Sequence, residues 1–209
     1  MWFMKNSEYK SHWENIYENK NENEVSWFQK NPETSTDLIK SSNIDKTSKI
    51  IDVGAGVSRL VDNLLELGFY NIDVVDISRN AINKTKTRLG KTSELVNWIE
   101  SDIINFKTNK KYQLWHDRAV FHFLNEKSQI ESYRNIAENS LESGSTLIIG
   151  TFSVNGPNKC SGLSVKQYDE NLIRNVFKNK FDAVSHKTVI HDTPFKTKQE
   201  FIFSTFKKK

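Results

Sequence analysis

The most informative segment of the sequence is Lys49-Ile50-Ile51-Asp52-Val53-Gly54-Ala55-Gly56-Val57-Ser58-Arg59-Leu60-Val61. Its apolar run ends at two glycines and passes into residues with helical apolar spacing, which predicts a buried strand over 50–53, a tight turn and a helix over 58–67. Glycines let the backbone approach a ligand where a Cβ atom would clash, and a helix start offers unpaired N–H donors. The segment therefore indicates a site for a nucleotide cofactor.

An acidic residue, Asp76, lies 20 residues beyond Gly56, at the end of a second apolar run that predicts a strand over 72–76. A carboxylate at the tip of the strand that follows a glycine turn can accept hydrogen bonds from both hydroxyls of a ribose. This order of residues suits a dinucleotide as well as S-adenosylmethionine.

Two residues favour S-adenosylmethionine. Dinucleotide folds require a third glycine three residues after the second, and Arg59 occupies that position. Asp52 falls at the buried end of the first strand, where a carboxylate is costly unless a cationic group meets it, as the α-ammonium of S-adenosylmethionine would. Alternatively, Asp52 caps its own glycine turn. An NAD-dependent oxidoreductase and a cofactor-binding module without catalysis are the alternative functions.

From about residue 12 onward, the sequence resembles the class I S-adenosylmethionine-dependent methyltransferases. Their first motif is similar to residues 52–56, their ribose acid to Asp76 and their adenine-side acid to Asp102, while 112–119 and 144–152 resemble their fourth and fifth strands. The resemblance implies an α/β fold: a Rossmann-like, mostly parallel seven-stranded sheet with helices on both faces and a final hairpin with one antiparallel strand. It also implies that Asp102 binds the adenine amino group and that Ile77 and Ile103 sandwich the ring, although both could be ordinary core residues.

The sequence predicts one methyltransferase domain over 1–209. Residues 1–45 would form an N-terminal helical lid, 46–152 the cofactor-binding core, and 153–209 an acceptor loop, a helix and the final hairpin. An amphipathic lead-in helix precedes a second helix, for which Asn31 is the expected cap and Pro32 the first helical residue. Beyond these and the elements above, we expect strands over 95–99, 112–116, 145–152, 181–191 and 199–206, and helices over 78–89, 126–141 and 168–178.

In open α/β sheets, ligands bind beyond the carboxyl ends of the strands, where the glycine turn, the two acids and the end of the fourth strand should converge. The predicted cofactor-binding residues are Trp13, Tyr17, Trp27, Asp52, Gly54, Ala55, Gly56, Arg59, Asp76, Ile77, Asp102, Ile103 and His116. The aromatic residues of the lead-in would fold over the crevice and pack on the sulfonium, where cation–π contact helps. For Trp13, core packing is the alternative.

The candidate catalytic residues are His116, Asp117, Arg118 and His122. His116 or Asp117 could act as a general base, or the two could only orient the cofactor and satisfy neighbouring backbone groups. Arg118 could pair with Asp117 or hold an anionic acceptor. His122 could equally be a buried, hydrogen-bonded histidine. Cys160, in the loop 153–166, could line an acceptor pocket or serve as a small apolar residue.

The methyl acceptor is indicated only by resemblance. Asp117-Arg118-Ala119 with an aromatic lead-in is similar to thiopurine S-methyltransferases, whereas Trp13-Glu14-Asn15-Ile16-Tyr17 with Trp27 resembles the lead-in of citrate synthase and elongation-factor lysine methyltransferases, in which an Arg commonly takes the place of Ile16. The chain lacks the Asn-Pro-Pro-Tyr type motif of base methylation. A small thiol or another small-molecule nucleophile is therefore the first choice of acceptor and a protein lysine the second, with S-adenosylhomocysteine as the product.

Composition excludes several classes. The 30 Lys and Arg and 26 Asp and Glu residues are spread along all 209 positions, so the net charge of +4 does not indicate nucleic-acid binding. A single cysteine excludes an internal disulfide, and the histidines lack zinc-type spacing, so no metal is expected. No apolar run reaches the ~20 residues of a membrane span, and residues 1–4 lack the apolar core of a secretory signal. We expect a cytoplasmic protein that does not bind membranes.

Overall fold

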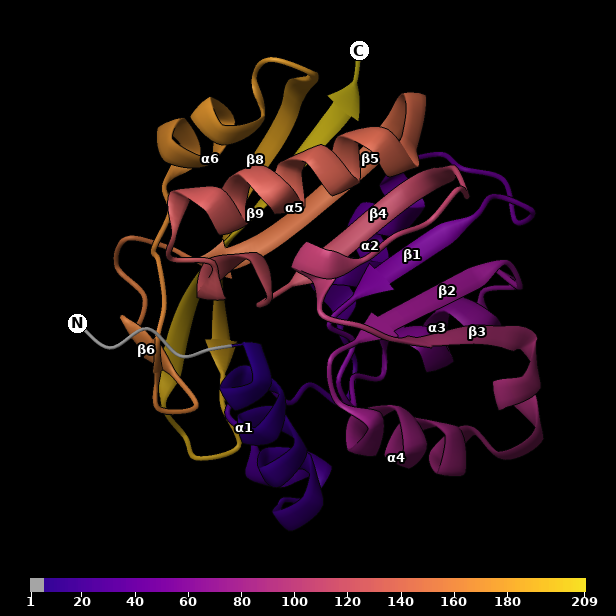
Figure 1. Ribbon diagram of the computed structural model, residues 1–209, viewed down its shortest axis with the longest axis vertical. Coiled ribbons are helices and arrows are strands. Elements are labelled where there is room, and N and C mark those ends of the chain that lie inside the picture. Colours follow the sequence, from indigo (N-terminus) through magenta and orange to yellow (C-terminus); the bar gives the residue numbers. More distant parts are fainter. Residues whose placement is uncertain (1–5) are drawn as a thin grey trace.

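The computed structural model describes residues 6–209, in which seven strands form one sheet in the order β3-β2-β1-β4-β5-β9-β8 (Figure 1). The strands are β1 (Ile50–Val53), β2 (Ile72–Asp76), β3 (Val96–Glu100), β4 (Tyr112–Arg118), β5 (Leu141–Phe152), β8 (Phe181–Asp192) and β9 (Lys198–Lys208). Neighbouring strands pair in parallel from β3 to β5, and β9 is antiparallel to both β5 and β8. The predicted mostly parallel sheet with one antiparallel strand is confirmed.

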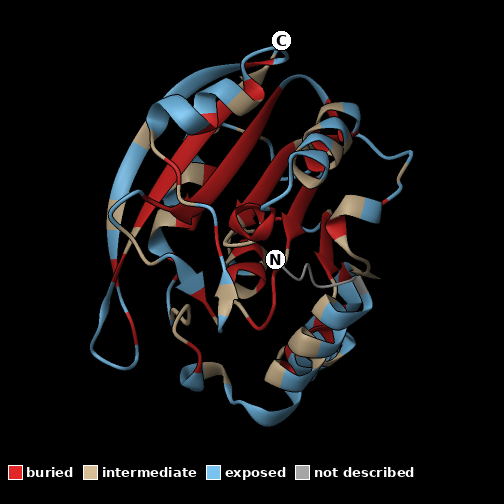
Figure 2. Cartoon of the chain, turned by 60° about the vertical axis from the view of Figure 1, so that its left-hand side comes forward, coloured by how far each residue is buried: buried red, intermediate tan, exposed pale blue. Residues whose placement is uncertain are grey.

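Helices cover both faces of the sheet. The helices α5 (Lys127–Ser140) and α6 (Glu170–Phe177) lie over one face, and α2 (Glu33–Ser41) and α3 (Leu60–Glu66) lie over the other (Figure 1). Because side chains alternate along a strand, Ile51 joins the apolar cluster under α5, whereas Ile50 joins the cluster under α3. Figure 2 shows the central strands buried between the helices, while the edge strand β8 is mostly exposed.

The remaining helices stand near the carboxyl ends of the parallel strands. The helix α4 (Arg79–Leu89) follows β2, and Ser78 caps it by accepting a hydrogen bond from the Ala81 N–H. The helix α1 (Asn6–Asn19) packs against α4. A short 3-10 turn, Glu22–Glu24, and an irregular segment then connect α1 to α2.

The glycine turn has the expected conformation. Gly54 and Gly56 have φ values of 62° and 55°, in the left-handed region that glycine adopts without strain. A Cβ atom at Gly54 would overlap the side chain of Val120, and one at Gly56 would overlap the Tyr17 hydroxyl. Both positions therefore require glycine for two independent reasons.

Several element boundaries differ from the predictions. Pro32 is the cap residue of α2 rather than its first helical residue, because its carbonyl already accepts the first helical hydrogen bond from the Thr36 N–H. β4 continues to Arg118 because it pairs with β5 as far as Gly150. The predicted loop 153–166 contains a short hairpin of β6 (Lys159–Cys160) and β7 (Leu163–Ser164).

Within residues 6–209, no helix has both the length and the apolar character that a membrane crossing needs. The expectation that residues 1–4 do not form a secretory signal concerns positions outside this described part of the chain.

Candidate cofactor and acceptor site

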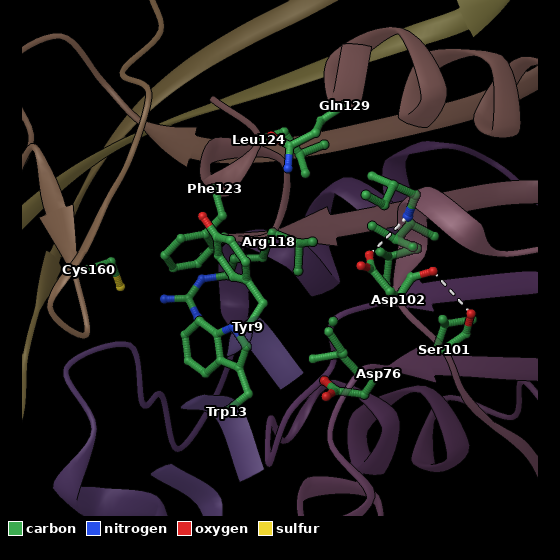
Figure 3. A pocket seen from close by; sticks show the side chains of 18 of the residues that line it. Tyr9, Trp13, Asp76, Ser101, Asp102, Arg118, Phe123, Leu124, Gln129 and Cys160 are labelled. Atoms are coloured by element: carbon green, nitrogen blue, oxygen red, sulfur yellow. Dashed lines mark hydrogen bonds between the residues drawn. The ribbon is translucent and has the colours of Figure 1, made fainter. Parts of the chain in front are cut away.

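A pocket lies at the carboxyl ends of β1, β2 and β4 and is covered by α1. Its empty volume is about 920 Å³, including the open mouth. From the predicted site residues it brings together Trp13, Tyr17, Trp27, Gly54, Asp76, Ile77, Asp102, Ile103, Arg118 and Cys160. In Figure 3, Asp76, Ser101 and Asp102 lie on one side, the acidic half; Arg118, Phe123 and Cys160 lie on the other, the Arg118 half.

Backbone amides hold the Asp76 carboxylate in place. Its Oδ2 accepts a hydrogen bond from the Gly56 N–H and its Oδ1 accepts one from the Ser78 N–H, both at 2.8 Å. Burial raises the pKa of Asp76 to about 6, although these two bonds act in the opposite direction. A carboxylate has about four acceptor positions, so those not used by the backbone can accept two hydroxyl groups.

Asp102 begins a 3-10 turn at the other end of the acidic half. Its Oδ1 accepts a hydrogen bond from the Ile104 N–H at 3.1 Å, and burial raises the pKa of this carboxyl. Ile77, Ile103 and Leu124 add apolar surface to the pocket around it. An apolar slot with one carboxylate at its edge suits a flat heterocycle that carries an amino group.

The aromatic residues of α1 line the pocket because they recur every four residues. Tyr9, Trp13 and Tyr17 therefore share one face of the helix. The ring centroid of Trp13 is 5.8 Å from that of Trp27 and 5.2 Å from that of Phe123, in edge-to-face geometry. Trp13 also packs against the apolar cluster around α3, so it is both a wall of the pocket and a core residue.

His116, which the sequence predicts to bind the cofactor, does not line the pocket. Its Nδ1 is 2.8 Å from Asp52 Oδ1 and its Nε2 is 2.9 Å from the Ser35 hydroxyl, with all three residues buried. In the structure, the buried Asp52 carboxylate is paired with the imidazole of His116, whereas the sequence analysis expected the α-ammonium of the cofactor. This contact ties β1 and β4 to α2. Asp52 does not line the pocket either.

Asp117 points to the opposite face of the sheet from His116, since successive strand residues alternate. Its Oδ1 accepts from the Val120 and Phe121 N–H groups, and its Oδ2 accepts from the Tyr133 hydroxyl at 2.6 Å. Burial raises the pKa of Asp117 to about 6. The carboxylate is therefore committed to the turn after β4 and to α5, and it neither lines the pocket nor pairs with Arg118.

Arg118 does line the pocket and is partly buried there, with the Nε and Nη2 atoms of its guanidinium shielded from solvent. One nitrogen, Nη1, donates to the Trp27 carbonyl at 2.9 Å, and the guanidinium lies over the Phe201 ring at 5.1 Å. In the described part of the chain, Nε and Nη2 have no hydrogen-bond partner. Burial lowers the pKa of Arg118 to about 10, while Cys160 and Asp52 oppose the shift, so the group still carries its charge at neutral pH.

Most of the other predicted residues do not line the pocket and make contacts within the protein instead. Arg59 forms an ion pair with Glu22 and does not line the pocket, and Ala55 and Gly56 are likewise absent from its lining, although Gly56 binds Asp76. His122 is buried, its Nδ1 accepts from the Phe152 N–H at 3.3 Å, and burial lowers its pKa to about 3, so it stays neutral. Burial raises the pKa of the Cys160 thiol to about 12.

The pocket is also lined by residues that were not predicted from the sequence, namely Tyr9, Val53, Val75, Ser101, Ile104, Ala119, Val120, Phe123, Leu124 and Gln129. Tyr9 could have been found, because it lies four residues before Trp13 on the same helical face. Gln129 had no such signal, because it belongs to α5 and comes to the pocket only through the packing of that helix.

The family model described as Nodulation protein S (NodS) matches residues 24–185. Malonyl-[acyl-carrier protein] O-methyltransferase 2 of Ilyobacter polytropus is 27% identical over 109 residues, which are 52% of this chain and 40% of that protein. Malonyl-[acyl-carrier protein] O-methyltransferase 1 of the same organism is 31% identical over 87 residues, 41% of this chain and 32% of that protein. The chain thus matches less than half the length of these curated relatives.

Solved structures share the fold along almost the whole chain. The N-methyltransferase NodS from Bradyrhizobium japonicum WM9, in complex with S-adenosylhomocysteine, has a TM-score of 0.70 at 17% identity and covers 94% of this chain and 98% of its own. A structure from work on the conversion of a disulfide bond into a thioacetal group during echinomycin biosynthesis has a TM-score of 0.78 at 13% identity, covering 95% and 92%. At these identities the likeness concerns the fold.

Proposed function

The chain belongs to the NodS family of class I S-adenosylmethionine-dependent methyltransferases, and from this premise we propose that it methylates a small-molecule nucleophile, most readily a thiol bound as its thiolate. The cofactor is S-adenosylmethionine, which becomes S-adenosylhomocysteine when it gives up its methyl group. The observation that carries the choice of acceptor is the buried guanidinium of Arg118.

The residues of the acidic half fit this cofactor. A side chain at Gly54 would need the space that Val120 fills at the pocket wall, so the glycine turn keeps the backbone accessible. Asp76 would hold the ribose hydroxyls, Asp102 the adenine amino group, and Ile77 and Ile103 the faces of the ring. When bound, the cofactor would supply an electrophilic methyl group. The lone pair of the acceptor would attack the methyl carbon in line with the breaking carbon–sulfur bond, and S-adenosylhomocysteine would be the leaving group.

The Arg118 half offers a positive charge, and among the described residues that line it there is no histidine or carboxylate. The two candidate bases, His116 and Asp117, are bonded elsewhere, and the other candidate histidine, His122, lies outside the pocket. An acceptor that ionises without a strong base therefore suits the site, and a thiol, with an ordinary pKa near 8.5, does so when a neighbouring cation stabilises its thiolate. Holding the acceptor atom in line with the methyl carbon would lower the activation free energy further, by about several kcal/mol.

A protein lysine, the second acceptor considered, fits this electrostatic setting less well. Its ammonium would meet the like charge of Arg118, and the Asp117 carboxylate that could accept its proton lies on the other face of the sheet. A carboxylate is a better second candidate. Two relatives are named for O-methylation of a malonyl group, and a guanidinium with two free nitrogens can bind a carboxylate through paired hydrogen bonds.

Methyl-labelled S-adenosylmethionine with a panel of thiols, carboxylic acids, phenols, amines and lysine peptides tests the proposal. We expect transfer to thiols, and we expect Arg118→Met to raise the acceptor KM while S-adenosylhomocysteine still binds. Arg134→Met on α5, outside the pocket, is the matched control. Transfer to lysine peptides that survives Arg118→Met would refute the proposal. Loss of S-adenosylhomocysteine binding in this variant would also refute it, by assigning Arg118 to the carboxylate of the cofactor.

A further inference from the structure

Glu14 makes an unusual long-range contact from the lid helix to the cofactor-binding core. Its Oε2 accepts hydrogen bonds from the Ser78 hydroxyl at 2.7 Å and from the Asn80 N–H at 3.0 Å, and its Oε1 accepts from the Arg79 N–H at 2.9 Å. The partners lie 64 to 66 residues away along the chain. The carboxylate of α1 thus occupies the amino-terminal end of α4, where free N–H groups and the helix dipole favour a negative charge.

The same few residues hold the predicted ribose acid. Ser78 donates its N–H to Asp76 Oδ1 and its hydroxyl to Glu14, and it accepts from the Ala81 N–H. Asp76 in turn accepts from the Gly56 N–H. A continuous series of hydrogen bonds therefore runs from Glu14 on the lid through Ser78 to Asp76 and the glycine turn.

Glu14 directly follows Trp13, and the helix that carries it supplies three aromatic residues to the pocket: Tyr9, Trp13 and Tyr17. When α1 is docked through Glu14, these side chains cover the pocket, and the Ser78 that binds Glu14 also holds the Asp76 carboxylate. When α1 is undocked, the amide groups of Arg79 and Asn80 lose their acceptor, and the Ser78 hydroxyl loses the group that orients it.

We propose that Glu14 is a positioning residue that couples docking of the lid helix to binding of the cofactor ribose at Asp76. Reciprocity follows from thermodynamic linkage: a cofactor that binds better to the docked state stabilises that state by the same factor. Glu14 touches neither the reacting atoms nor the pocket. The inference does not depend on the identity of the acceptor. The coupling can therefore fail while the proposed acceptor is correct, and the proposed acceptor can be wrong while the coupling holds.

Binding of S-adenosylhomocysteine, measured by calorimetry without any acceptor, tests the coupling. Glu14→Gln keeps the shape of the side chain and removes its charge, and we expect it to raise the dissociation constant about 5- to 150-fold, the usual range of such couplings. Glu18→Gln, an exposed position on the same helix, is the matched control and should bind as the wild type does. Equal affinities for the two variants would overturn the inference.

Hydrogen exchange of α1 separates coupling from a merely structural role. In the wild type, S-adenosylhomocysteine should slow exchange of the amides in 9–17, and this slowing should be largely lost in Glu14→Gln. Ser78→Ala breaks the series at its middle, so its effect on affinity should overlap with that of Glu14→Gln in the double variant rather than add to it. Full additivity, or ligand-induced slowing that Glu14→Gln leaves unchanged, would overturn the inference.

Discussion

Replacing Asp76 with asparagine should weaken cofactor binding strongly while the fold persists. Asp76 accepts one backbone hydrogen bond on each oxygen, from Gly56 and Ser78, and its remaining lone pairs face the pocket. Asparagine keeps the shape, but one of its two ends becomes a donor, so that end faces a backbone N–H it cannot satisfy. The variant also loses the charge that strengthens hydrogen bonds to a ribose.

The expected loss can be given a size. A hydrogen bond to a charged group is worth about 1.5–3 kcal/mol, and the variant should lose about one such bond to the ligand. At about 1.4 kcal/mol for each factor of ten, the dissociation constant for S-adenosylhomocysteine should rise about 10- to 150-fold. Calorimetry measures it, with thermal melting as the control for folding. A dissociation constant within twofold of wild type would refute the assignment of Asp76.

Acidification should have a similar effect on the wild type. The pKa of Asp76 is raised to about 6 by burial, so its carboxylate is protonated as pH falls through 6 and can no longer accept two hydroxyls. Affinity for S-adenosylhomocysteine should therefore fall below pH 6, and this fall should be missing in Asp76→Asn. For stability the sign is opposite: with a folded pKa above the unfolded value of about 3.9, the buried charge opposes folding above pH 6, and that cost diminishes toward pH 4.

Three further substitutions test the glycine turn, the buried Asp52–His116 pair and the aromatic residues that α1 places in the pocket. Gly54→Ala should cost about 1–2 kcal/mol from its left-handed φ alone, plus the overlap with Val120, and should abolish S-adenosylhomocysteine binding; an unchanged melting temperature and affinity would contradict the account of the turn. His116→Ala should lower the free energy of unfolding in urea by about 3–5 kcal/mol because Asp52 stays buried without its partner, whereas unchanged stability with a large loss of turnover would restore His116 as a catalytic residue. Trp13→Ala should lower kcat about tenfold or more by misplacing the reacting groups, and full turnover in this variant would show that the residue serves packing alone.

The sequence was sufficient for the sheet and for the acidic half of the site, because both depend on local patterns. Apolar runs, the glycine turn and acids at strand ends are readable within a few residues, and parallel strands bring their carboxyl ends to one edge. For this reason the sequence predicts Gly54, Asp76 and Asp102 in one crevice, and all three line the same pocket.

For the fourth strand, the prediction that both His116 and Asp117 lie at the cofactor could have been avoided from the sequence alone. Successive residues of a strand face opposite sides, so His116 and Asp117 could not both face the same ligand. The partners that occupy them were beyond sequence reasoning. Ser35 and Tyr133 come from helices on opposite faces of the sheet, and nothing local to either residue announces its contact. The free nitrogens of Arg118 were likewise visible only when all of its neighbours were placed.

The segment between α1 and α2 has a consequence for the order in which the protein assembles. His191 donates its Nε2–H to the Ser26 carbonyl at 2.8 Å, and Gln199 reaches the Ser26 hydroxyl at 3.3 Å, across 165 and 173 residues of chain. During synthesis, Ser26 leaves the ribosome long before these partners exist. Contacts of such separation form late, since closing a long loop costs entropy before it is rewarded. The parallel strands can therefore associate first. The segment around Ser26, next to the pocket residue Trp27, is fixed only when the β8–β9 hairpin has joined the sheet.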